Sequence, residues 1–358
     1  MSQTPAHLTD PKLQNSLFLK ACRGEATPHT PIWLMRQAGR YMSEYRAVRA
    51  KHDFLEVCHT PELALEVTLQ PINAFDLDAS ILFSDLLIPL EPMGAVVKFP
   101  KGGPVIENPI ESVADVEKLI VTDARETMGF VGDACALIRN GLPDTTPLIG
   151  FAGAPYTLAS YLIEGGSTRN FLKTKTFLYE HPEAAEALFE KLADQVISLL
   201  NMQVDRGCSV VQIFDSWAGS MDPADYERWG ARYTRRIVEG VRRPGVPVIV
   251  FAKGTGTYFD LVAGTGADVL GVDWTLPLEK ARAIVGDGVT LQGNLDPARL
   301  LSPWSALKPA VDVVLDAAGD GTGHIFNLGH GITPKTPVDT VKRLVDYVHE
   351  ASAKKRGE

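Results

Sequence analysis

Short apolar runs, bounded by glycine, proline or polar residues, recur along the chain and are followed by segments with helical periodicity. Continuous runs of this length are typical of strands that are buried on both faces, as in a parallel sheet covered by helices. We therefore predict that each run forms one strand. The runs lie at residues 31–35, 80–84, 147–152, 209–214, 246–252, 268–272, 289–293 and 324–328.

Three of the intervening segments have clear helix signals. Residues 182–206 are rich in Ala, Leu and Glu, residues 224–242 follow an Asp-Pro start signal, and residues 338–353 follow Pro337. Eight strands joined by helical crossovers predict a single (β/α)8 barrel of the TIM type over residues 1–358. A doubly wound open sheet is the alternative fold.

The connection between the second and third predicted strands is unusually long, at about sixty residues. It contains the sequence VVKFPKGGPVIENP, in which apolar and polar residues alternate around a Gly-Gly-Pro turn. This pattern predicts a hairpin inserted between strands 2 and 3. The last residues, about 353–358, are expected to fray.

Composition narrows the class of protein. With 45% hydrophobic and 22% charged residues the chain has the composition of a soluble globular protein, and no apolar run is long enough to span a bilayer. The formal charge of −9 argues against nucleic acid as a partner. The four cysteines lack the C-x-x-C spacing of a zinc site, and the N-terminus lacks an export signal, so we expect a cytoplasmic protein with reduced thiols.

In parallel barrels and open sheets, ligands bind at the carboxyl ends of the strands, so the residues that follow each run are candidate site residues. Arg36 and Arg40 follow the first run in PIWLMRQAGRY, with Gly39 between them and no acidic residue within this segment. A guanidinium group matches a carboxylate in bidentate geometry, and a glycine lets backbone amides approach the same anion. The pair is therefore interpreted as a carboxylate clamp.

Other strand ends carry further candidates. Asp85 follows an apolar run, and Pro89 leaves little room for a helix that it could cap, which favours contact with a ligand. His330 lies between two glycines, where an anion pocket or an acid/base role competes with a purely structural one. Spacing alone does not choose between Asp215 and Ser216.

The remaining candidates have simpler explanations. A tyrosine on a helix, such as Tyr161, is more often part of the core. Asp273 and Asn294 are interpreted as caps, whereas Lys253 ends a strand and could serve as a Schiff-base nucleophile. The chain contains no Walker A loop, no G-x-G-x-x-G after a strand, no G-x-S-x-G and no H-E-x-x-H, which disfavours nucleotide, serine-hydrolase and metal chemistry.

Two long segments, PIWLMRQAGRY and GFAGAPYTLASYLIEGG, resemble the signature segments of the uroporphyrinogen decarboxylase family. The shorter segments FSDLLIP, IFDSWAG, QGNLDP and FNLGHGI extend the resemblance along nearly the whole chain. The resemblance implies a (β/α)8 barrel, usually a homodimer, that decarboxylates the four acetate side chains of uroporphyrinogen to give coproporphyrinogen without a cofactor or metal. The substrate contacts it implies are Arg36, Gln37, Ala38, Gly39, Arg40, Asp85, Tyr161, Ser216 and His330.

In this interpretation the arginines hold substrate carboxylates, and Asp85 accepts hydrogen bonds from the pyrrole N–H groups and stabilises a cationic intermediate. Arg36 is the first candidate for the proton donor, and His330 or Tyr161 acting through water is the alternative. Two other functions remain open: a zinc-dependent methyltransferase of the same superfold and a non-catalytic tetrapyrrole-binding protein.

Overall fold

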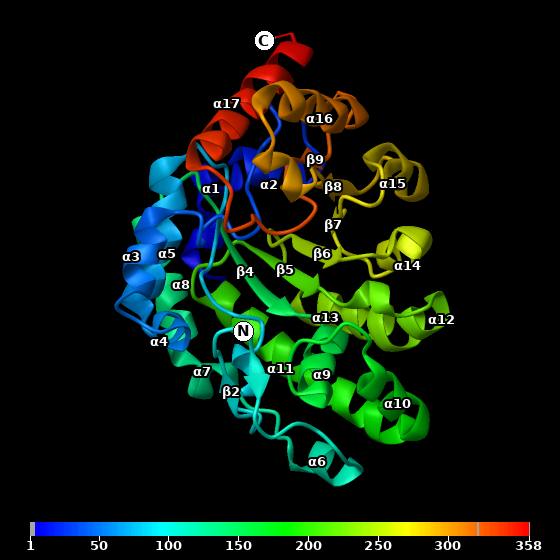
Figure 1. Ribbon diagram of the computed structural model, residues 1–358. Helices are drawn as coiled ribbons and strands as arrows, with labels where there is room; N and C mark the ends of the chain where they lie inside the picture. The colour runs from blue at the N-terminus through cyan, green and yellow to red at the C-terminus, as the bar shows by residue number, and fades with distance from the viewer. Residues whose placement is uncertain (1–3, 321, 358) are drawn as a thin grey trace.

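The computed structural model describes residues 4–320 and 322–357. Within this part of the chain, seven strands form a curled parallel sheet with the order β1-β4-β5-β6-β7-β8-β9. Helices surround the sheet on its outer side (Figure 1). The strands are β1 (Ser80–Ile81), β4 (Leu148–Gly153), β5 (Val210–Asp215), β6 (Val248–Ala252), β7 (Val269–Gly271), β8 (Thr290–Gln292) and β9 (His324–Ile325).

Seven of the eight predicted strands are confirmed, because each overlaps one strand of this sheet, although β4 and β5 end one residue later than predicted. The first predicted strand, residues 31–35, has only a single parallel bridge, from Ile32 to Phe326. Pro31 has no N–H to donate to a ladder, and the backbone of Arg36 turns into the left-handed region with φ = 62°, so pairing has little length in which to develop. Ile32 also contacts the other edge, because its carbonyl accepts the N–H of Asp78 at 2.9 Å.

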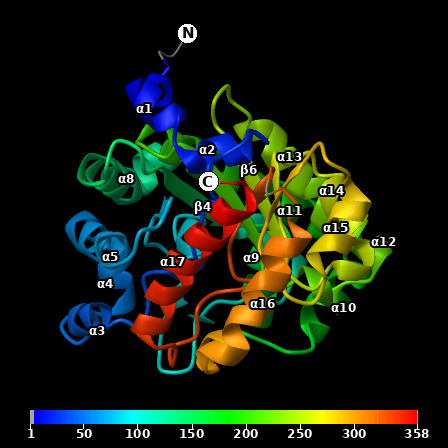
Figure 2. The ribbon, with the colours of Figure 1, turned by 90° about the horizontal axis from the view of Figure 1, so that it is seen from above.

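The predicted helices are present with small shifts in their boundaries. Residues 182–206 correspond to α11 (Pro182–Asp205). Residues 224–242 comprise α12 (Pro223–Asp225), a π-helical turn (Tyr226–Ala231) and α13 (Arg232–Val241). The last helix, α17 (Val338–Lys355), extends two residues beyond the predicted end. In Figure 2, α16 (Trp304–Ala317) and α17 lie side by side on the outside of the molecule.

The other helices complete this outer layer and the two ends of the molecule. They are α1 (Pro11–Gln14), α2 (Leu17–Cys22), α3 (Ser43–Arg49), α4 (Phe54–His59), α5 (Pro61–Ala74), α6 (Val113–Lys118), α7 (Ala124–Thr127), α8 (Gly129–Gly141), α9 (Pro155–Glu164), α10 (Leu172–Glu180), α14 (Phe259–Ala263) and α15 (Leu278–Val285).

A second, two-stranded sheet lies outside the parallel one. Its strands β2 (Val97–Lys98) and β3 (Val105–Ile106) pair antiparallel, with Val97 opposite Ile106. In Figure 1 β2 lies below the parallel sheet. Phe99 and Pro104, which belong to this segment, reach the cavity described below.

One end of the parallel sheet is closed by apolar packing. One buried cluster joins residues of α1 and α2, among them Phe18, to the beginnings of the strands: Ala79 directly before β1, Ile149 in β4, Val210 in β5 and Val269 in β7. The amino ends of the strands are therefore covered by the N-terminal helices. The carboxyl ends are left for a cavity.

Candidate active site

A cavity of about 320 Å³ lies at the carboxyl ends of the strands, within the size range of small-molecule sites. Residues that follow β1, β4, β5 and β6 line it, together with the loop after residue 35 and the segment around β2. Of the predicted site residues, those with side chains or backbone in its wall are Arg36, Ala38, Asp85, Tyr161, Ser216 and His330. Gln37, Gly39 and Arg40 lie outside the lining.

Arg36 is held in an uncommon backbone conformation at the edge of the cavity. Its φ of 62° lies in the left-handed region, which costs free energy for a residue with a side chain and is frequently found at functional sites. Gly331 makes room for its stem, since a Cβ there would lie 2.5 Å from Cδ of Arg36. Within the described residues, no carboxylate lies within 4.0 Å of the guanidinium group, which leaves it available to an anionic ligand.

Asp85 lies four residues after β1 and is half-buried in the cavity wall. Burial among apolar residues raises the pKa of its carboxyl to about 6, although the Leu87 N–H and the Arg36 guanidinium favour the charged form. The Leu87 N–H donates to Oδ1 at 2.9 Å. No hydrogen bond to Oδ2 is found in the described part of the chain, so this oxygen can accept from a ligand. Asp85 caps none of the described helices, and this local contact with the Leu87 N–H leaves its second oxygen for the ligand-binding interpretation.

Tyr161 and Ser216 contribute further polar groups to the cavity wall. Tyr161 lies on α9, and its ring is 5.9 Å from that of Trp217. Burial raises the pKa of the Tyr161 hydroxyl, so it remains protonated and can donate a hydrogen bond. Ser216 directly follows β5 and lines the cavity.

Asp215, which spacing did not separate from Ser216, is fully buried and lies outside the cavity lining. The Thr157 hydroxyl donates to its Oδ1 at 2.7 Å, and its Oδ2 has no hydrogen-bond partner in the part of the chain that the structure describes. Burial raises the pKa of this carboxyl to about 6. The two neighbours thus differ in environment: Ser216 faces the cavity, and Asp215 lies in the interior of the fold.

His330 lies in the cavity wall between two aromatic rings. Its imidazole stacks at 6.3 Å from both Phe251 and Trp274. Burial, with added repulsion from Arg36 and Lys253, lowers the pKa of His330 to about 4. Its side chain is therefore neutral near pH 7 and offers one N–H donor and one acceptor.

The residues between the two predicted arginines shape the loop. Gln37 is buried, and its side chain bonds to the backbone of Leu34 and Ala79 at 3.2 and 3.3 Å. Gly39 lies close to the Arg36 carbonyl, which a Cβ would approach to 3.1 Å. Arg40 is exposed, and its carbonyl accepts a hydrogen bond from Arg46 at 2.9 Å.

Several cavity residues were not among the predicted site residues. Lys253, which follows β6, adds a second cation to the wall, and its Nζ lies 5.7 Å from the Trp274 ring. Its position directly after a predicted strand marks Lys253 as a candidate site residue, although the sequence supports it only as an alternative nucleophile. Aromatic rings form much of the remaining surface: Phe83, Phe99, Phe151, Phe214 and Trp217.

Asp273 and Asn294 have structural roles near this edge. Oδ1 of Asp273 accepts the Thr275 N–H at 2.6 Å, and the Asn294 amide donates to the Asp273 carbonyl at 2.8 Å. Neither residue lines the cavity. Both residues therefore have structural roles, but the interpretation as helix caps is wrong: α15 is preceded by Pro277, and Asp296 caps the turn that follows Asn294.

The cysteines are poorly placed for a metal centre in the cavity. Cys22, Cys58, Cys135 and Cys208 are all buried, and none lies among the described residues of the lining. Burial raises the pKa of the Cys22 and Cys58 thiols, which disfavours the thiolate form that binds zinc.

Together these features define an enzyme-like α/β fold with a cavity for an anionic, partly apolar small molecule. The uroporphyrinogen decarboxylase (URO-D) family model matches residues 13–351. The chain is 48% identical over 340 residues to a uroporphyrinogen decarboxylase of Carboxydothermus hydrogenoformans, covering 95% of this chain and 97% of the relative. It is 51% identical over 333 residues to one of Sorangium cellulosum, with 93% and 95% covered. The chain belongs to the uroporphyrinogen decarboxylase family.

A solved methyltransferase from Methanosarcina mazei shares the fold, with a TM-score of 0.76 at 19% identity, covering 93% of this chain and 97% of that one. This similarity concerns the fold alone. None of the described helices combines the length and the apolar character needed to cross a bilayer.

Proposed function

We propose that the cavity binds uroporphyrinogen and is the site where its acetate side chains lose carbon dioxide. As a member of its family the chain is a carboxy-lyase, which converts uroporphyrinogen to coproporphyrinogen in tetrapyrrole biosynthesis. The observation that carries the placement is that Arg36 and Asp85 line the same cavity with opposite charges and aromatic walls around them.

Substrate binding requires cations for its carboxylates and an acceptor for its pyrrole N–H groups. The Arg36 guanidinium and the Lys253 ammonium supply positive charge within the cavity, and Arg40 supplies it outside the lining, toward solvent. Asp85 faces the ring nitrogens with its unpaired Oδ2. Tyr161, Ser216 and His330 add hydrogen-bonding groups, while Gln37, Ala38 and Gly39 hold the backbone of the arginine loop.

Each decarboxylation replaces a carboxylate by a hydrogen, with net uptake of one proton. Protonation of the pyrrole carbon beside the acetate makes the ring cationic. The bond to the carboxylate then breaks, and its electrons neutralise the ring as carbon dioxide leaves. The resulting methylene takes up a proton to become a methyl group, and the proton added to the ring carbon is released.

Asp85 stabilises the ring cation, which exists only along the reaction path. At about 4 Å and an effective dielectric constant near 20, this attraction is roughly 4 kcal/mol. Such a difference corresponds to about a thousandfold in rate.

Arg36 is the proposed proton donor, and His330 or Tyr161 acting through water is the alternative. The lowered pKa of His330 means that it carries no extra proton near pH 7 in the free protein. It can act as an acid only if the carboxylates of the bound substrate raise its pKa. The raised pKa of Tyr161 keeps its hydroxyl protonated in the free protein, so it can donate without first taking up a proton.

The finer architecture also belongs to this proposal. We propose that residues 31–35 close the sheet into an eight-stranded barrel, supported by the bridge of Ile32 to Phe326 and the hydrogen bond from Asp78 to Ile32. The β2–β3 pair is then a hairpin inserted between barrel strands 2 and 3. The chain forms one domain that works in the cytoplasm as a homodimer, without a cofactor.

Release of carbon dioxide from anaerobically reduced uroporphyrinogen tests the activity, with product detected as coproporphyrin after oxidation. Binding without release would indicate a non-catalytic tetrapyrrole-binding protein. Borohydride trapping with a carbonyl substrate tests the alternative use of Lys253 as a Schiff-base nucleophile, and a covalent adduct at Lys253 would contradict the proposed role. The methyltransferase alternative is disfavoured because no cysteine lines the described cavity.

A further inference from the structure

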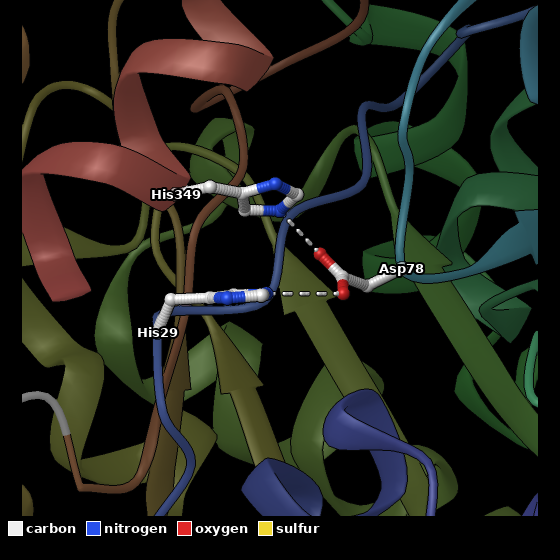
Figure 3. Close-up of side chains that lie close together, drawn as sticks. All are labelled: His29, Asp78 and His349. Carbon is white, nitrogen blue, oxygen red and sulfur yellow. Dashed lines mark hydrogen bonds and ion pairs between the residues drawn. The ribbon is translucent and has the colours of Figure 1, made fainter. Parts of the chain in front are cut away.

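Two histidines and an aspartate meet at the end of the sheet opposite the cavity. His29 lies in the loop before Ile32, Asp78 lies two residues before β1, and His349 lies on α17. Figure 3 shows both imidazole rings directed at the carboxylate of Asp78. We call these three residues the His29–Asp78–His349 cluster. Its members come from three distant parts of the sequence, so the fold itself brings them together.

The distances in this cluster match those between ligands of one small cation. Nε2 of His349 lies 2.9 Å from Oδ2 of Asp78, and Nε2 of His29 lies 3.6 Å from Oδ1. Zinc–ligand bonds of about 2.0–2.1 Å at tetrahedral angles place neighbouring ligand atoms about 3.3–3.4 Å apart. The observed separations lie on either side of this value.

The two imidazoles approach each other closely enough to share an ion. The three candidate ligand atoms all lie within 4.8 Å of one another. The ring centroids of His29 and His349 are 4.1 Å apart. Because His29 lies in a loop, rotation of its ring can bring its nitrogen and that of His349 to the separation that two ligands of one ion require.

Neighbouring groups hold the side chains of the cluster in position, as neighbouring groups do in metal sites. The Ile32 N–H donates to Oδ2 of Asp78 at 2.7 Å, which orients the carboxylate. The other ring nitrogen of His349, Nδ1, lies 3.7 Å from a carboxylate oxygen of Asp76. A histidine that binds a metal commonly directs its second nitrogen at a carboxylate, which fixes the ring.

One member of the cluster has a polar atom without a partner. Among the described residues, the buried Nε2 of His29 finds no hydrogen-bond partner, since 3.6 Å to Asp78 is too long for a hydrogen bond. The side chains of Asp78 and His349 are only 12% and 14% exposed. The Asp78 carboxylate and an unsatisfied imidazole nitrogen therefore face one point.

We propose that the His29–Asp78–His349 cluster binds one first-row transition-metal dication, with Zn²⁺ as the expected ion and water in the remaining position. Two imidazoles and one carboxylate are a ligand set suited to such ions. The ion joins α17 to the segments that begin at His29 and Asp78. It stabilises the fold and takes no part in decarboxylation, because the proposed reaction site lies at the other end of the strands.

The test uses the full chain after treatment with a chelator, in a non-coordinating buffer at pH 7.5. Zinc chloride is titrated in by calorimetry, and the unfolding temperature is measured with and without it. We expect one ion per chain and a rise in Tm of about 3–5 °C at saturation. His29→Gln and His349→Gln should each weaken binding by at least about tenfold.

His52→Gln is the matched control. His52 also contacts a carboxylate, that of Glu56, at 2.7 Å, but both side chains are substantially exposed. Among the described residues, no second imidazole joins this pair to complete a set of three ligands. Its loss should leave zinc affinity and the Tm shift unchanged. The amide of glutamine keeps a hydrogen-bonding group in each variant.

Absence of saturable zinc binding to the parent protein would overturn the proposal. So would a His29→Gln/His349→Gln double variant that binds zinc with the parent's affinity, since the ion would then lie elsewhere. If a variant fails to fold, electron paramagnetic resonance of Cu²⁺ bound to the parent protein decides. Couplings to two imidazole nitrogens support the cluster, and a spectrum with one or none contradicts it.

Discussion

Two aspartates flank the short strand β1, and their environments are opposite. Asp78 lies two residues before the strand, at the covered end of the sheet, and its pKa is lowered. Asp85 lies four residues after it, in the cavity wall, and its pKa is raised to about 6. The same residue type is therefore held firmly ionised at one end of the strand and close to its titration point at the other.

The difference arises from the number of groups that face each carboxylate. Burial disfavours the charged form at both positions. Asp78 is compensated by a backbone N–H and by two imidazoles, whereas Asp85 receives one backbone N–H and the more distant charge of Arg36. An incompletely compensated carboxylate gains most from a cation that develops beside it, which suits Asp85 to catalysis and Asp78 to structure.

The largest expected effect is on turnover at Asp85. Asp85→Asn removes the charge that stabilises the cationic ring, so we expect the single-turnover rate of coproporphyrinogen formation to fall about a thousandfold. Substrate affinity should fall much less, because the amide still accepts a hydrogen bond from a pyrrole N–H. Asp76→Asn, at the other end of the sheet, is the control and should keep the parent rate. Near-normal turnover in Asp85→Asn would exclude the cation-stabilising role.

The next largest expected effect is on stability. The two aspartate substitutions should change the free energy of unfolding in opposite directions. At pH 7 ionised Asp85 costs folding free energy, so Asp85→Asn should raise the free energy of unfolding by about 1–2 kcal/mol. Asp78→Asn should lower it by about 3 kcal/mol, because it breaks the contacts of a buried, paired carboxylate. Urea unfolding in the presence of a chelator measures both. If both substitutions changed the free energy of unfolding in the same direction, the contrast between the two environments would have no effect on stability.

Hydrophobic patterning was sufficient to predict the sheet, because buried parallel strands are marked by continuous apolar runs. It failed in part at residues 31–35, where proline and the turn at Arg36 shorten the pairing despite an apolar sequence. The cavity position of Asp85 followed from its place after a strand. In contrast, the burial of Asp215 beside the cavity-lining Ser216 depends on backbone direction, which the sequence does not reveal.

The His29–Asp78–His349 cluster was not predicted, for a related reason. Its residues are separated by 49 and 271 positions and fit no local spacing of metal ligands. Only the tertiary fold, which places α17 beside the segments that carry His29 and Asp78, brings them together. A weak signal existed in Asp78, an acidic residue directly before an apolar run.

The pH dependence of activity should follow Asp85 and not His330. Since the pKa of Asp85 in the free protein is about 6, kcat/KM should fall about tenfold per pH unit below that value, as the carboxylate takes up a proton. His330, with a pKa of about 4, stays neutral through this range. The fall of kcat/KM at low pH should therefore persist in His330→Gln. If it disappeared in that variant, the titrating group would be His330.

The stability profile provides a matching test at the other end of the strand. The raised pKa of His349 means that its contribution to stability is complete below about pH 6.5, its ordinary pKa, and is lost as the pH rises through the folded-state value. The stability lost in His349→Gln, measured without metal, should therefore shrink from pH 6 to pH 9. A constant difference across this range would mean that His349 stabilises the fold by packing alone.

The smallest expected effect concerns the two arginines that follow residues 31–35. Both arginines are exposed, but Arg36 lines the cavity and Arg40 lies outside the lining, so the contact of Arg40 with a substrate carboxylate is screened by water. Arg40→Ala should weaken substrate binding by about 1 kcal/mol, roughly fivefold, with little change in the single-turnover rate of the bound complex. Arg36→Ala should weaken binding more and also slow turnover. If Arg40→Ala slowed turnover while affinity stayed unchanged, Arg40 would act on the reacting acetate and its role as a carboxylate clamp would be wrong.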